Sequence, residues 1–165
     1  MDRTDIELVI KARDNPSFYI EHFLGQILSK ENEVLLSELH SSSLFENNNS
    51  KLTLCYILWY VTFHYDRTIL IGANKFDQCK LLIGELNMLT NILPSYMRLD
   101  IKEFNKHGIR FSNGCQVISE AIGYTFGKGR TVNILYLYDF DNIQQQRKDS
   151  YYQWWKSSSY LPNRR

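Results

Sequence analysis

The sequence is poor in cysteine and has no long apolar run. Its three cysteines, Cys55, Cys79 and Cys115, are widely spaced in apolar surroundings. Neither a disulfide framework nor a CxxC metal site is therefore available, and we interpret all three as buried thiols. No stretch approaches the roughly 20 apolar residues of a membrane span, and acidic residues interrupt any signal-peptide core near the N-terminus. These absences predict a cytoplasmic protein without membrane contact.

The chain also lacks an excess of charge of either sign. Its 19 lysines and arginines nearly balance 18 aspartates and glutamates, which leaves a net charge of +1. Overall charge therefore does not identify a partner. With 165 residues, of which 44% are apolar, the chain can bury one sizeable core, and we expect a single domain.

Two common catalytic arrangements are missing as well. None of the four histidines has a cysteine or carboxylate neighbour at the spacing that a metal site needs. Structural or exposed roles are therefore favoured for them. No serine lies in a G-x-S-x-G context, so the sequence does not support a serine hydrolase.

The hydrophobic pattern predicts an α/β fold. An N-terminal helical segment (residues 1–43) is expected to precede an α/β core (residues 44–165) in the same domain. Helices are predicted at 3–13, from Pro16 onward, and at 31–39, 52–63, 75–92 and 148–158; strands are predicted at 68–72 and 132–139 and in a hairpin within 108–120. Short apolar strands between helices favour a mostly parallel sheet with helices on its faces.

Two segments carry the clearest local signals. Residues 52–63 are apolar on all sides and too numerous for an ordinary strand, which favours a buried helix. The dipeptide Asn113-Gly114 joins two alternating runs and supplies the positive φ angles of a tight hairpin turn. A glycine-rich loop follows at 123–130.

The order of the segments is that of a P-loop ATPase. In such enzymes a turn after one strand exposes backbone N–H groups to phosphates, a lysine adds positive charge and a Ser or Thr hydroxyl holds Mg²⁺. A second strand then ends in Asp-Glu, which orders the metal and the attacking water. Here Leu44-Phe45 leads through residues 47–53 into the buried helix, and the later strand ends at Asp139.

Several segments in this order resemble the ATPase domain of the large terminase subunit of tailed phages, the DNA-packaging motor. The similar segments are NPSFYIEHF at 15–23 (NPxxFIENY in the family), ILIGANK at 69–75 (the strand after the P-loop helix), LPSYM at 93–97 (LPxWL), FSNGCQV at 111–117 (the xLxNGSxI hairpin), and GKGR at 127–130 with the strand ending at 139 (GRG and the second nucleotide motif). The resemblance covers residue 15 onward, and it implies a P-loop NTPase fold. It covers only the front of the motor, so we expect no nuclease domain.

The resemblance also implies candidate site residues. ATP would be held by Asn49, Ser50, Lys51 and Thr53, and Mg²⁺ by Thr53 and Asp139. Arg130, in the loop with Lys128, corresponds to the arginine that reaches the nucleotide of a neighbouring subunit. The alternatives remain open: Lys51 as a solvated loop lysine, Asp139 as the polar end of a strand, and Arg130 as part of a basic surface loop.

The sequence departs from the family where catalysis would occur. No glycine lies between Lys30 and Ile71, so the turn lacks the residue that lets backbone approach phosphate closely. Phe140 occupies the position of the catalytic Glu, and Asp141 could replace that Glu only if the strand end were shifted. Loss of such a general base commonly costs about 10²–10⁴ in rate.

Two functional hypotheses follow. The chain is either a terminase-like protein of viral DNA packaging with weak or no ATP hydrolysis, or a pseudo-ATPase that serves as a protein-binding module or inhibitor in a phage or satellite system. The first implies packaging components or other subunits as partners, with DNA contact and homo-oligomers, in the cytoplasm of an infected bacterial host. ATP and Mg²⁺ are its implied cofactors.

Overall fold

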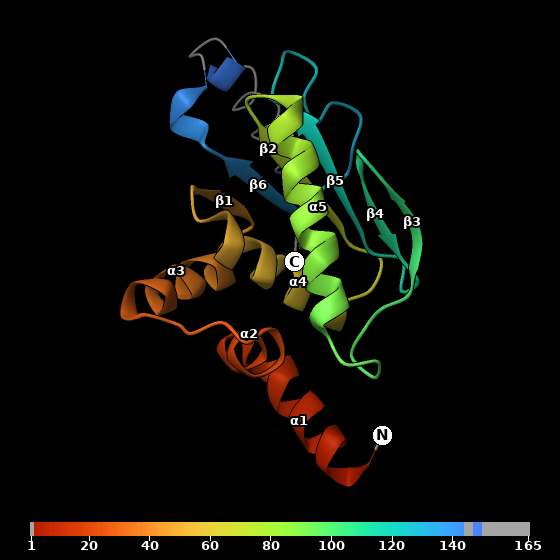
Figure 1. The fold of residues 1–165 in the computed structure, drawn as a ribbon. Coiled ribbons are helices and arrows are strands. Elements are labelled where there is room, and N and C mark those ends of the chain that lie inside the picture. The colour runs from red at the N-terminus through yellow and green to blue at the C-terminus, as the bar shows by residue number, and fades with distance from the viewer. Residues whose placement is uncertain (1, 144–146, 150–165) are drawn as a thin grey trace.

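The computed structural model describes residues 2–143 and 147–149, and it begins with three helices (Figure 1). These are α1 (Arg3–Asp14), α2 (Pro16–Leu24) and α3 (Lys30–Ser41), close to the predicted ranges. Asn15 ends α1 and also caps α2, because its side chain accepts a hydrogen bond from the Phe18 N–H at 3.0 Å. Pro16 then occupies the first turn of α2, where its missing N–H costs nothing.

The rest of the described chain has two strand–helix units followed by four successive strands. In chain order the elements are β1 (Leu44–Asn47), α4 (Ser50–Phe63), β2 (Thr68–Ala73), α5 (Phe76–Ile92), β3 (Ile101–Asn105), β4 (Gly108–Phe111), β5 (Gln116–Ala121), β6 (Ile134–Tyr138) and the 3-10 helix η1 (Phe140–Asn142). The predicted helix at 148–158 lies mostly outside the described residues. Residues 147–149, which are described, are helical.

The six strands form one mixed sheet in the order β1-β6-β2-β5-β4-β3. Neighbours among β1, β6, β2 and β5 are parallel, and the β5-β4-β3 side is antiparallel. The mostly parallel α/β sheet and the hairpin through Asn113-Gly114 are therefore confirmed. Strand β3 was not predicted, because most of its residues are exposed and its apolar content is low.

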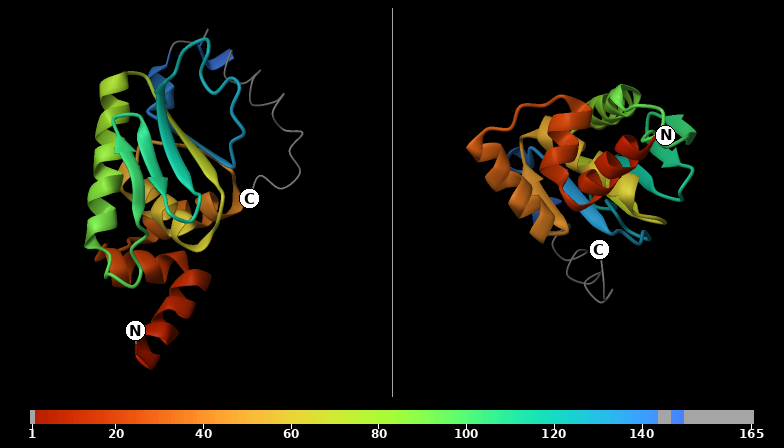
Figure 2. Two further views of the ribbon diagram at one scale, coloured as in Figure 1. Left: turned by 90° about the vertical axis from the view of Figure 1, so that its right-hand side faces the viewer. Right: turned by 90° about the horizontal axis from the view of Figure 1, so that it is seen from below.

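The direction in which the chain crosses the sheet explains the position of the helices. From β1 to β2 and from β2 to β5 the chain moves towards β3, and the connecting helices α4 and α5 pack together on one face. From β5 back to β6 the direction reverses, so a right-handed connection lies on the opposite face. There Ile122, Phe126 and Val132 pack with Leu70 and Leu137. In the described part of the chain the helices thus cover one face, and an irregular connection covers the other (Figure 2).

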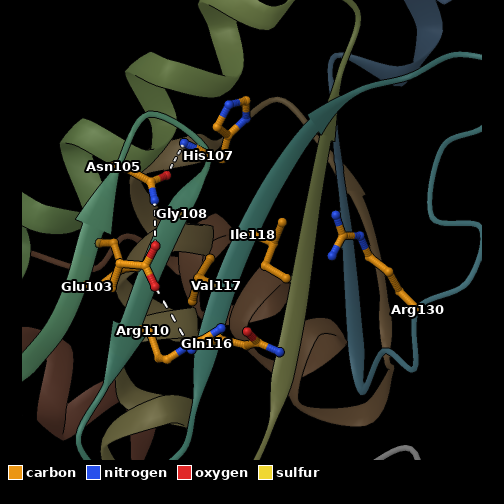
Figure 3. A pocket seen from close by; sticks show the side chains of 10 residues that line it. Glu103, Asn105, His107, Gly108, Arg110, Gln116, Val117, Ile118 and Arg130 are labelled. Atoms are coloured by element: carbon orange, nitrogen blue, oxygen red, sulfur yellow. Dashed lines mark hydrogen bonds and ion pairs between the residues drawn. The ribbon is translucent and has the colours of Figure 1, made fainter.

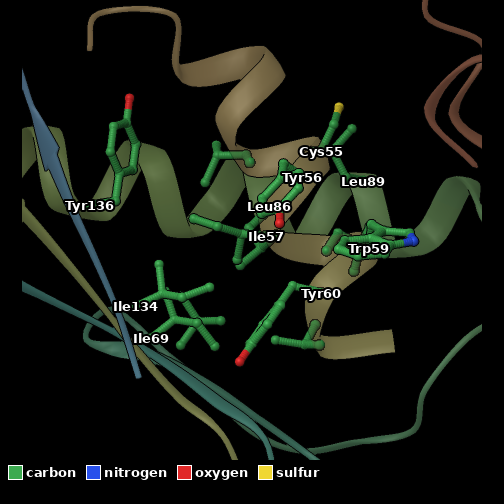
Figure 4. Close-up of a cluster of buried hydrophobic side chains, with 14 of the residues drawn as sticks. Cys55, Tyr56, Ile57, Trp59, Tyr60, Ile69, Leu86, Leu89, Ile134 and Tyr136 are labelled. Atoms are coloured by element: carbon green, nitrogen blue, oxygen red, sulfur yellow. The ribbon is translucent and has the colours of Figure 1, made fainter. Parts of the chain in front are cut away.

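Helix α4 is the centre of the main core. All residues from Leu52 to Val61 are buried, as the all-round apolar sequence predicts. Tyr56, Trp59 and Tyr60 pack between the neighbouring helices and the strands (Figure 4). Burial of a side chain of this size contributes about 1.5–3 kcal/mol. The Trp59 indole N–H donates to the Ala12 carbonyl at 2.9 Å, which ties α1 to α4.

Both edges of the sheet are modified. At the β1 edge, the Ser42 hydroxyl donates to the Leu44 carbonyl oxygen (2.9 Å) and accepts from the Leu44 N–H (3.0 Å). At the β3 edge, the register shifts between Ile101 and Glu103. Such local pairing and bulges are devices that limit strand addition.

The cysteines are buried thiols, as their apolar surroundings predict. All three cysteines are free and buried, and burial raises the pKa of the Cys55 thiol to about 12. Within the described ranges, no helix has the length and apolar character needed to cross a membrane, and no cluster of three potential metal ligands occurs.

The hairpin turn should be a sensitive point for stability. Asn113 Nδ2 donates to the carbonyl oxygens of Val61 (2.7 Å) and His64 (2.9 Å), and its Oδ1 accepts from the Cys115 N–H (3.1 Å). We expect Asn113→Ala to lower the free energy of unfolding by about 2–3 kcal/mol, because three hydrogen bonds are lost: two to the C-terminal end of α4 and one within the turn. Urea denaturation measures the change. Ser112→Ala, at an exposed neighbouring residue, is the control; equal stability of the two variants would contradict the role of Asn113.

Candidate functional site

The Asn-rich turn and Asp139 leave the sheet at the same edge. Strands β1 and β6 are adjacent and parallel, with Asn47 opposite Tyr138 in the register. The turn into α4 follows Asn47 directly, and Asp139 follows Tyr138. An open hollow of about 230 Å³ lies here, lined by Glu46, Asn47, Asn48, Phe140 and Asp141. This is the place where a P-loop ATPase would bind its nucleotide phosphates.

Asparagine side chains close the turn internally. Asn47 Oδ1 accepts hydrogen bonds from the Asn49 backbone N–H (3.0 Å) and from Thr53 Oγ1 (2.9 Å). Asn49 Oδ1 in turn accepts from the Leu52 N–H (3.2 Å) and so caps α4. Two N–H groups and the hydroxyl of the expected Mg²⁺ ligand are therefore occupied by side-chain oxygens of the turn itself.

The other predicted phosphate ligands lie elsewhere around α4. Ser50 and Lys51 form the first turn of α4 and line a separate hollow of about 450 Å³ that faces α5, together with Leu54 and Met88. The hollow beside Asp141 does not include Lys51 among its lining residues. The structure thus places Lys51 and Asp141 in the linings of different hollows.

Asp139 is part of a tight turn. Its backbone is left-handed (φ 55°), and its Oδ1 accepts a hydrogen bond from Asn142 Nδ2 at 2.7 Å. The next residue, Phe140, is buried in the apolar cluster on the face opposite the helices. Its ring also borders the hollow, where a carboxylate would be needed to orient water.

The hollow is acidic. Burial raises the pKa of the Glu46 carboxyl, and the nearby Asp141 carboxylate raises it further, whereas Lys148 acts in the opposite direction. Lys148 Nζ lies 3.5 Å from the Asp141 carbonyl oxygen and 4.9 Å from the centre of the Phe140 ring. A polyphosphate fits this set of groups poorly, because its charge would meet the carboxylates of Glu46 and Asp141.

Arg130 lies on a different part of the molecule. Its guanidinium binds the Glu120 carboxylate, with Nε to Oε1 at 2.7 Å, and Glu120 Oε2 also accepts the Gly127 N–H at 3.3 Å. Glu120 thereby fastens the glycine-rich loop to β5. Arg130 borders a hollow of about 200 Å³ on the face of the sheet opposite the helices, next to Gln116 and Ile118 (Figure 3). That hollow shares no lining residue with the one beside Asp141.

Three contributions were not assigned from the sequence. Glu46 and Asn47 lie within the segment singled out, but nothing in the pattern distinguishes an asparagine that closes the turn from one that faces a ligand. Glu120 had no visible signal, because its partner Arg130 is ten residues away across an irregular loop.

Comparison of the sequence with known families finds no family model that matches it, and no curated protein is significantly similar to it.

The raised pKa of Glu46 predicts a pH-dependent effect of its removal. In the folded protein the ionised form of Glu46 is disfavoured. Glu46→Gln should therefore increase the free energy of unfolding at pH values above the pKa that Glu46 has in the folded protein. The gain should stay below about 1 kcal/mol, because the group is partly hydrated. The gain should decrease as the pH falls through the raised pKa, and it should be absent below pH 4.5, the ordinary pKa of a glutamate. Thermal melts from pH 4 to 8 test this. Glu38→Gln, at an exposed glutamate of α3, is the control, and a gain that persists in acid would contradict the assignment.

Proposed function

We propose that this chain is a terminase-like protein related to viral DNA packaging that retains the packaging-ATPase scaffold without ATP hydrolysis. The ordered segments from residue 15 onward support the kinship. The parallel pairing of β1 with β6 supports it independently, since it brings the two nucleotide-motif positions to one edge of the sheet. We place its action in the cytoplasm of an infected bacterium, among packaging components.

The observation that carries the loss of activity is the bonding of Asn47. Its side-chain oxygen holds both the Asn49 N–H and the Thr53 hydroxyl. Nucleotide binding would have to break these contacts and place phosphate beside the Glu46 and Asp141 carboxylates. Phe140 adds a second defect, since an apolar ring cannot accept a proton from water.

A chain of this kind acts through binding rather than turnover. Within a packaging system it would occupy the place of an active subunit or hold other components together. The second candidate function, a protein-binding module or inhibitor of a phage or satellite system outside packaging, is favoured by the same closed turn. The two are distinguished by whether nucleotide binding can be restored by opening the turn.

Mg-ATP should not stabilise the wild-type protein. A ligand at 100 times its dissociation constant adds about 2.7 kcal/mol to the free energy of unfolding, which raises the melting temperature of a chain this long by about 5–10 °C. We expect no measurable shift with millimolar Mg-ATP in differential scanning fluorimetry. Mg²⁺ with inorganic sulfate is the control for ionic strength. A clear ATP-specific rise in the melting temperature would contradict the proposal that the site does not bind nucleotide.

Opening the turn should restore anion binding if the scaffold is that of a packaging ATPase. The double variant Asn47→Ala with Ser50→Gly frees the Asn49 N–H and the Thr53 hydroxyl and supplies a glycine before Lys51. We expect it to gain an ATP-dependent shift of at least about 2 °C, and addition of Phe140→Glu to allow slow phosphate release. The matched control is Asn48→Ala with Ser50→Gly, which leaves both bonds intact. If the double variant is folded and shows no larger ATP-dependent shift in melting temperature than the control, the second candidate function is favoured.

A further inference from the structure

A groove runs between helices α4 and α5. Helix α5 lies along the outside of the helical layer, and α4 packs against it (Figures 1 and 2). Between the two helices is the hollow of about 450 Å³, lined from α4 by Lys51 and Leu54 and from α5 by Glu85, Met88, Leu89 and Ile92. It shares no lining residue with the hollow beside Asp139. The groove is therefore a separate surface of the molecule.

The groove is apolar at its floor and along its α5 side. Leu54 is 0% exposed and Leu89 is 9% exposed, so they form the floor of the hollow. On α5, Leu81, Met88 and Ile92 are 67%, 62% and 54% exposed, and intervals of seven and four residues place them on one side of the helix. A row of exposed apolar side chains beside an apolar hollow is typical of a surface that another molecule covers.

The length of the exposed row favours a helix as the occupant. The row extends from Leu81 to Ile92, which is about 16 Å along the helix axis at 1.5 Å per residue. The hollow borders only the part from Glu85 to Ile92, so a small ligand in it would leave Leu81 uncovered. A partner helix of about three turns would cover the whole row and insert apolar side chains into the hollow.

Each side of the groove also carries one exposed charge. Lys51 lies on the α4 side and Glu85 on the α5 side. Neither side chain forms an ion pair or hydrogen bond with any other residue of the described ranges, and they do not pair with each other. By contrast, Asp77 and Lys80 at the start of α5 pair at 2.7 Å. A partner in the groove is therefore selected for an acidic group towards α4 and a basic group towards α5.

We propose that this groove binds an amphipathic helix of another protein. The apolar row of that helix packs on Leu81, Met88 and Ile92, an acidic residue on one flank pairs with Lys51, and a basic residue on the other flank pairs with Glu85. The two pairs fix the direction of the helix, because reversing it would exchange its flanks and bring like charges together. The inference goes beyond the proposed function and does not depend on it, since it uses no residue of the hollow beside Asp139.

A yeast-display library of helices tests the proposal with the full chain. Its members are about 18 residues long, with a fixed row of leucines and with Glu, Lys or Gln at the flanking positions. We expect the wild type to select helices with Glu on one flank and Lys on the other. These helices should bind Met88→Asp at least about tenfold more weakly, because a charge replaces an apolar contact within the row.

The control is Val34→Asp, at an apolar residue 60% exposed on α3, which should bind the selected helices like the wild type. Circular dichroism confirms that each variant is folded. Selection of no helix by the wild type, or equal weakening by the two variants, would overturn the proposal.

A charge exchange tests the flanking ion pairs. Glu85→Lys should weaken binding of a selected helix by about threefold, as expected for one exposed ion pair. Replacing the basic flank of the helix by Glu should then restore binding, and failure to restore it would contradict the assigned contact. Sedimentation equilibrium of the chain alone tests for a second copy as the occupant. Self-association that Met88→Asp abolishes would also overturn the proposal.

Discussion

The enclosure of α4 is the constraint on which the rest of the structure depends. Its partners come from every side: α1 through Trp59, α2 through the Tyr19 and Thr62 hydroxyls (3.2 Å), and the hairpin through Asn113. Because the helix has no polar face, it needs the sheet below it and a layer of helices around it. The N-terminal helices are therefore part of the same core as the sheet. The Asn-rich turn is also held in place, because it leads directly into the buried helix α4.

The elements that sequence reasoning identified are those with strong local signals. The all-apolar segment at 52–63 corresponds to α4, and Asn113-Gly114 marks the β4–β5 hairpin. Strand β3 had no such signal, because it is an edge strand of mostly exposed residues with little apolar content, although only two residues join it to β4. The helices on a single face also could not be derived, since the strand order decides on which side each connection lies.

The candidate site was predictable in position but not in chemistry. Parallel strands place the residues after β1 and β6 at one edge, so the closeness of the Asn-rich turn and Asp139 follows from general topology. Whether a side chain faces a ligand or its own backbone depends on ångström-scale geometry. Asn47 illustrates this, since the same amide could have lined an open pocket and instead closes the turn. Arg130 is similar, since only the fold reveals that Glu120 holds it.

The Ser42 hydroxyl has a consequence for how copies of this protein can meet. It occupies both the N–H and the C=O of Leu44, so an incoming strand cannot pair at this residue of the β1 margin. At the opposite edge, the register shift in the β3–β4 pairing is an irregularity of the kind that hinders strand addition. Growth of the sheet from molecule to molecule, the route to fibrils, is thereby discouraged.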